Sequence, residues 1–90
     1  MKKYYFLGIK GTGMASLAII LKQLGHEVIG SDISDYVFTE INLKMHGIEI
    51  LTFNEKNITE DFPYTIIYST AFNENNPEFK KARELGLKMM

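Results

Sequence analysis

Hydrophobic runs alternate with amphipathic segments along the whole chain, which is the pattern of successive strand–helix–strand units. Five short runs of bulky or β-branched residues predict strands at residues 4–9, 27–30, 48–51, 64–68 and 87–90. Helical spacing between them predicts three helices, which end near Gly25, Gly47 and Gly86. The pattern therefore predicts an α/β domain: a Rossmann-like parallel sheet of about five strands with helices on both faces.

Each helix has an apolar side that we expect to face the sheet. In the first helix this side consists of Met14, Leu17, Ala18, Leu21 and Leu24. The second helix is weaker; we expect an N-cap at Ser34 or Asp35 and an apolar side made of Val37, Phe38, Ile41 and Met45. The third begins at Asn76-Pro77-Glu78, with an N-cap, a proline and an acidic first turn, and buries Phe79, Ala82 and Leu85.

Composition limits the possible function classes. The 90 residues fit one domain, and ten basic and eleven acidic residues give a net charge of −1 without a cationic stripe. We therefore expect neither a nucleic-acid partner nor a membrane partner. Cysteine is absent, which fits a cytoplasmic location. Because the chain ends within a strand-like run, we expect a larger parent protein.

The segment Gly8-Ile9-Lys10-Gly11-Thr12-Gly13 joins the first strand to the first helix. Glycines there allow backbone amides to approach a phosphate at the helix N-terminus. Lys10 replaces the middle glycine of the dinucleotide pattern, and its ammonium could contact a phosphate instead. A P-loop is excluded because Met14 and Ala15 stand where lysine and a hydroxyl are required. The alternative is a tight turn needed only for close helix packing.

Three further segments carry polar candidates. Asp32 ends the second strand about 20 residues after the glycine turn, where Rossmann domains place an acid that binds ribose, and Ser31 precedes it. Ser69 and Thr70 end the fourth strand, where open α/β sheets bind ligands. Each pair could instead satisfy loop amides. His26 and His46 lack partners at metal-ligand spacing, so no metal site is predicted.

These segments together resemble the N-terminal domain of the Mur ligases, in particular the group that joins UDP-N-acetylmuramate to L-alanine and its relative that attaches recycled murein peptide. The resemblance covers nearly all 90 residues. It is carried by four ordered matches: Phe6-Leu7-Gly8-Ile9 through Gly11-Thr12-Gly13-Met14, Leu24-Gly25-His26-Glu27-Val28 through Gly30-Ser31-Asp32, Ser69-Thr70-Ala71, and Asn76-Pro77-Glu78 through Ala82-Arg83-Glu84-Leu85-Gly86.

The resemblance implies a three-domain, ATP-dependent carbon–nitrogen ligase of peptidoglycan synthesis, with residues 1–90 as the domain that holds the UDP part of the substrate. A central domain would bind ATP and Mg, and a third would help to bind the amino acid. No cofactor and no catalytic residue are expected in this segment. By resemblance, the amides around Lys10, Gly11, Thr12, Gly13 and Met14 would hold the pyrophosphate, and the uridine would be bordered by Ser31, Asp32, Ser69 and Thr70.

Two positions depart from the pattern of many family members: Lys10 replaces a glycine, and Phe53-Asn54 replaces a Gly-His pair. A divergent relative acting on another UDP-sugar or peptide thus stays open. Two alternatives from other classes also stay open: an NAD-binding Rossmann domain of an oxidoreductase or regulatory module, and a structural domain whose glycine turn binds nothing.

Overall fold

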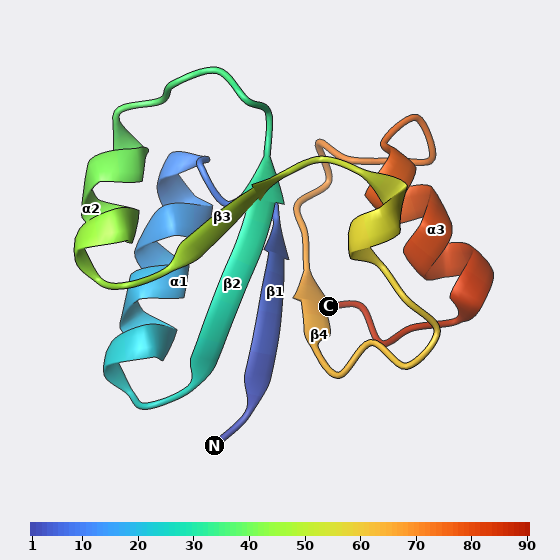
Figure 1. Cartoon of the computed structure of the whole chain (residues 1–90), viewed down its shortest axis with the longest axis horizontal. Helices are drawn as coiled ribbons and strands as arrows, with labels where there is room; N and C mark the ends of the chain where they lie inside the picture. The colour runs from blue at the N-terminus through green and yellow to red at the C-terminus, as the bar shows by residue number, and fades with distance from the viewer.

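A computed structural model describes all 90 residues and shows a four-stranded parallel sheet with helices on both faces (Figure 1). The elements in chain order are β1 (Lys3–Leu7), α1 (Thr12–Gln23), β2 (Glu27–Asp32), α2 (Thr39–Met45), β3 (Glu49–Thr52), the 3₁₀ turn η1 (Glu55–Asn57), β4 (Thr65–Ile67) and α3 (Pro77–Leu85). The predicted α/β class and parallel sheet are confirmed. No helix is both long enough and apolar enough to cross a membrane.

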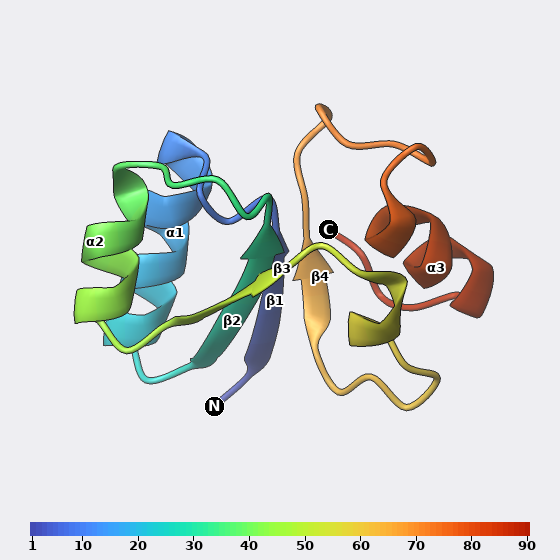
Figure 2. The ribbon, with the colours of Figure 1, turned by 45° about the horizontal axis from the view of Figure 1, so that its top comes forward.

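The strand order is β3-β2-β1-β4, so the two central strands are β1 and β2. Helices α1 and α2 cover one face of the sheet, and α3 and η1 cover the other (Figures 1 and 2). Each face has its own core. The first includes Phe6, Ala18 and Val28, and the second includes Tyr5, Ile66 and Phe79. Alternate residues of β1 thus supply both cores, as the two-residue period of a strand requires.

The sheet has four strands rather than about five, and the predicted last strand is reduced to a single bridge. Met89 forms an isolated parallel bridge with Ile66. The amide of Met90 donates to the carbonyl of Ile66 at 2.8 Å, and the amide of Ile66 donates to Lys88 at 3.0 Å. The segment therefore adds to the edge of β4 at the position expected for a fifth strand.

The predicted start of the second helix was wrong. Helix α2 begins at Thr39, after Phe38, and neither Ser34 nor Asp35 caps it. The cause is tertiary, because the ammonium of Lys10 donates 2.8 Å hydrogen bonds to the carbonyls of Ile33 and Asp35. Residues 33–37 are consequently held in an irregular loop rather than in the first turn of a helix.

The predicted apolar sides of the first two helices were only partly correct. In α1 the fully buried residues are Ala15 and Ala18, while Leu17 is 41% and Leu24 is 68% exposed. Small residues on the sheet side let the helix lie close to the strands. The predicted Met14 and Leu21 are partly buried and pack against the core, whereas Leu17 and Leu24 face outward. In α2, Leu43 is buried, and three of the residues expected inside are exposed: Phe38, Ile41 and Met45.

Candidate functional site

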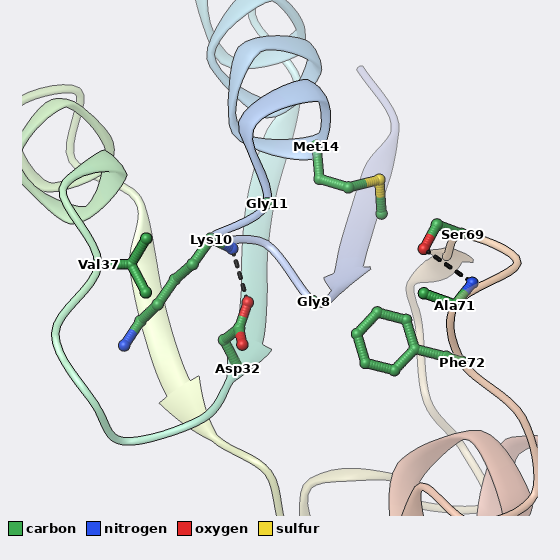
Figure 3. Close-up of a pocket in the computed structure, with 9 residues that line it drawn as sticks. All are labelled: Gly8, Lys10, Gly11, Met14, Asp32, Val37, Ser69, Ala71 and Phe72. Atoms are coloured by element: carbon green, nitrogen blue, oxygen red, sulfur yellow. Dashed lines mark hydrogen bonds between the residues drawn. The ribbon is translucent and has the colours of Figure 1, made fainter.

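A cavity of about 370 Å³ lies at the carboxyl ends of the central strands (Figure 3). The chain leaves β1 toward β2 and β3 on one side and returns to β4 on the other, so this is the point where the strand order reverses. Open parallel sheets bind ligands at such a point. The cavity is lined by Gly8, Lys10, Gly11, Met14, Asp32, Val37, Ser69, Ala71 and Phe72.

Three backbone amides at the start of α1 have no partner within the protein. No side chain caps this helix end, and the amides of Thr12, Gly13 and Met14 make no backbone hydrogen bond. Two preceding amides are used internally: that of Gly11 donates to Gly8 at 3.2 Å, and that of Lys10 donates to Asp32 at 2.8 Å. The helix dipole adds partial positive charge at the same end, so this end of the cavity suits an anion.

The glycines of the turn have different structural roles. Gly8 has φ +85°, and a Cβ there would come within 2.5 Å of the Phe72 ring, so the fold itself requires glycine. At Gly11 the nearest atom to an added Cβ is 3.5 Å away, and at Gly13 nothing lies within 4 Å. Close helix packing therefore does not explain Gly11 or Gly13, because an added Cβ would make only ordinary contacts at Gly11 and would meet open space at Gly13.

The ammonium of Lys10 is bonded within the protein. The Lys10 side chain is 5% exposed, and its ammonium, besides the two loop carbonyls, lies 3.0 Å from Glu40. Figure 3 shows the side chain extending away from Gly8 and Phe72, along the Val37 side. The hydrogen bond from Lys10 holds the pKa of the Glu40 carboxyl below its ordinary value. The ammonium is thus neutralised internally, which argues against a contact between Lys10 and a bound phosphate.

Asp32 lies at the rim of the cavity with both carboxylate oxygens bonded to amides. Oδ2 accepts from Lys10 at 2.8 Å, and Oδ1 accepts from Ile33 at 2.7 Å. This is the loop-satisfying role that the sequence left open for Asp32. Each oxygen keeps a further lone pair, so the half-buried carboxylate can also accept from a ligand hydroxyl.

The other predicted polar residues are not all brought together. Ser31 is fully buried and its hydroxyl donates to Glu78 at 2.6 Å, so it lies outside the cavity. Ser69 lines the cavity, and its oxygen accepts from the amide of Ala71 at 3.3 Å. Thr70 is exposed and does not line the cavity.

Two residues near the site escaped the sequence analysis. Phe72 forms the cavity wall opposite Asp32 and makes an edge contact with Phe53, their ring centroids being 5.8 Å apart. Glu78 was expected only to favour the helix dipole, but its carboxylate is fully buried. The proline before Glu78 fixes the helix start, yet no local signal indicates which way the carboxylate turns. The cavity contains no cluster of His, Cys, Asp or Glu that could hold a metal ion.

The sequence of this chain is similar to those of a known protein family. The sequence profile described as "Mur ligase family, catalytic domain" matches residues 3–90. The UDP-N-acetylmuramate–L-alanine ligase of Lactiplantibacillus plantarum is 52% identical over 84 residues, which are 93% of this chain and 19% of that relative. The ligase of the same name from Pediococcus pentosaceus is 51% identical over 87 residues, 97% of this chain and 20% of that relative. This chain spans about a fifth of the length of these curated relatives.

Solved structures show the same fold. The UDP-N-acetylmuramate:L-alanyl-γ-D-glutamyl-meso-diaminopimelate ligase of Neisseria meningitides superimposes with a TM-score of 0.88 at 27% identity, covering 100% of this chain and 28% of that chain. The UDP-N-acetylmuramate-alanine ligase of Thermotoga maritima gives a TM-score of 0.83 at 28% identity, covering 99% of this chain and 20% of that chain.

Proposed function

This chain belongs to the Mur ligase family, and from that premise we propose that its cavity binds the diphosphate of UDP-N-acetylmuramate or a closely related UDP-sugar. The proposal is carried by one observation: α1 begins with three unpartnered amides, and Met14, the last of these three residues, lines an open cavity at the switch point of the sheet. A diphosphate supplies the anionic oxygens that such amides bind. The amides of Thr12, Gly13 and Met14 would make these contacts, next to Gly11 in the cavity lining.

The uridine would occupy the rest of the cavity. Asp32 would accept a hydrogen bond from a ribose hydroxyl, and Ser69 would contact the nucleoside from the opposite side. Phe72 and Val37 supply apolar walls. Lys10 and Ser31, whose side chains are engaged elsewhere, would act by holding the turn and the end of β2, with Thr70 at the outer edge.

The relatives are named as ligases, and we propose that this chain is the N-terminal substrate domain of such an enzyme. ATP and its Mg ion would be bound by a central domain of the parent protein, which would couple ATP cleavage to amide formation. The glycine turn does not fit ATP, because Met14 and Ala15 offer neither an ammonium for the terminal phosphates nor a hydroxyl for Mg. By itself the domain would bind substrate in the cytoplasm without catalysing the ligation.

A proline at position 12 tests the amide contacts directly. Thr12 is the first residue of α1 and its amide is unpartnered, so proline removes a donor that the helix does not use. Gly11 already has φ −62° and ψ 144°, the conformation preferred before proline. We expect Thr12→Pro to bind UDP at least tenfold more weakly than Thr12→Ala, since a hydrogen bond to a charged group contributes about 1.5–3 kcal/mol.

Thr12→Ala is the matched control, because it removes the same hydroxyl but keeps the amide. Titration calorimetry with UDP, UDP-N-acetylmuramate and NAD measures the affinities, and thermal unfolding checks that both variants are as stable as the unaltered chain. Equal UDP affinities for the two variants would contradict the amide contacts. Binding of NAD in preference to UDP would favour the oxidoreductase-like alternative, and no binding of any of the three would leave a structural domain.

A further inference from the structure

A fully buried carboxylate joins four segments of the chain behind the cavity. Oε1 of Glu78 accepts from the Tyr5 hydroxyl at 2.9 Å and from the Ser31 hydroxyl at 2.6 Å. Oε2 accepts from the Asn54 amide at 3.0 Å and from the Asn57 side chain at 2.8 Å. The partners come from β1, β2, the loop after β3 and η1, while Glu78 itself lies in the first turn of α3.

All four partners of Glu78 are neutral donors. No lysine, arginine or histidine pairs with it, and no buried side-chain atom around it lacks a partner. Burial raises the pKa of the Tyr5 phenol above its ordinary value, so this hydroxyl stays a donor. Four donors converging on an acceptor with about four lone-pair sites form a complete network, which fixes the positions of the groups that it connects.

One branch of this network leads to the glycine turn. The carbonyl of Ser31 accepts two hydrogen bonds, from the amide of Gly8 at 2.8 Å and from that of Ile9 at 3.0 Å. The hydroxyl of the same residue is bound to Glu78. The Ser31 side chain is therefore fixed by Glu78 of α3, and the Ser31 carbonyl in turn fixes the first two amides of the turn.

We propose that Glu78 and Ser31 form a positioning relay, through which the start of α3 sets the placement of the phosphate-binding turn. The proposal rests on the proposed function of the turn. Neither residue touches the ligand: Ser31 is buried behind the cavity, and Glu78 is one further contact away. Ser31, which the sequence suggested as a uridine contact, is thereby assigned to the support of the pyrophosphate contacts instead.

A pair of variants separates this role from a general contribution to stability. Ser31→Ala and Tyr5→Phe each remove one hydroxyl donor from the same oxygen of Glu78. Only the first cuts the connection to the turn, because no hydrogen bond joins Tyr5 to Gly8 or Ile9. We expect Ser31→Ala to bind UDP about fivefold more weakly than the unaltered chain and Tyr5→Phe to bind with little change.

Hydrogen exchange gives a readout that does not depend on UDP. In Ser31→Ala the amides of Gly8 and Ile9 should exchange faster than in Tyr5→Phe, relative to the slowest core amides of the same variant. Equal exchange and equal UDP affinity in the two variants would overturn the relay. If the unaltered chain fails to bind UDP, the proposed function fails, and the exchange comparison still decides whether the relay exists.

A measurement on the unaltered chain covers the case in which Ser31→Ala does not fold. Buried, hydrogen-bonded hydroxyl protons exchange slowly enough to be followed by nuclear magnetic resonance. On addition of UDP, the Ser31 hydroxyl proton should shift together with the amides of Gly8 and Ile9, while the Tyr5 hydroxyl proton should shift much less. Shifts of the Tyr5 and Ser31 protons of equal size, or of neither proton despite UDP binding, would contradict the relay.

Discussion

Gly30 shows how a single position can decide whether the site forms. It lies in β2, directly under the turn that follows β1. A Cβ there would lie 2.6 Å from the carbonyl oxygen of Phe6 and 2.7 Å from Cδ1 of Ile9. The residue has no unusual φ, so its glycine is required by the closeness of the neighbouring backbone rather than by conformation. Because Gly30 has no side chain, the turn that contains Ile9 can pack directly against β2.

We therefore expect Gly30→Ala to lower the free energy of unfolding by about 1–3 kcal/mol, the usual cost of overpacking a filled core. Gly13→Ala is the control, because its Cβ would meet nothing within 4 Å and alanine favours a helix. Urea unfolding of both variants gives the comparison. A Gly30→Ala chain as stable as the Gly13→Ala chain would show that the turn can move away from β2.

At the scale of elements, α3 is the helix whose ends are best specified. The Asn76 side chain accepts from the amides of Glu78 at 2.9 Å and Phe79 at 3.1 Å, Pro77 follows at the first helical position, and Gly86 ends the helix with φ +68°. Proline at the start and a left-handed glycine at the end is the expected asymmetry of a helix. This cap also orients the first turn, from which the Glu78 carboxylate enters the core.

Replacing Asn76 by alanine should lower the free energy of unfolding by about 1 kcal/mol, the typical effect of losing an N-cap. Asn75→Ala serves as the control, since Asn75 takes part in the preceding turn through its backbone amide rather than its side chain. Thermal unfolding followed by circular dichroism measures both. Equal losses in the two variants would mean that the cap seen here does not stabilise α3.

On the scale of the whole molecule, the ion pair between Lys10 and Glu40 ties the first turn to the second helix. Glu40 also contacts the exposed Lys44 at 3.3 Å and accepts from the amide of Val37 at 3.2 Å. The carboxyl therefore connects the turn, the loop that borders the cavity and α2. Since its pKa is lower in the folded chain than its ordinary value, folding favours the ionised form.

The ionised Glu40 carboxyl should make the stability of the folded chain depend on pH. A carboxyl with a lowered folded-state pKa contributes stability above its unfolded pKa, and that contribution is lost as the pH falls through the folded value. We expect the melting temperature of the unaltered chain to fall more between about pH 5 and pH 3 than that of Glu40→Gln. Glu60→Gln, an exposed carboxyl without an ion pair, should behave like the unaltered chain. Parallel curves for all three chains would contradict the assignment.

The sequence by itself determined the fold class, the four strands of the sheet, the third helix and the family. These conclusions depend on local signals: period-two and helical spacing, an Asn-Pro-Glu helix start and glycines at turns. The resemblance to the Mur ligases is confirmed by the profile match and the relatives. The position of the glycine turn at the end of β1 is likewise local information, so the location of the candidate site was predictable, while its contacts with UDP stay a prediction.

Only the tertiary structure decided what each polar side chain does there. Lys10 turns its ammonium to the loop before α2, and Ser31 turns its hydroxyl to Glu78, which is 47 residues away in sequence. The hydrogen-bond partner of a buried charge or hydroxyl often comes from a segment that is distant in sequence. Local spacing of residues does not indicate which segment that is. For the same reason spacing alone misplaced the start of α2 and the buried sides of the first two helices.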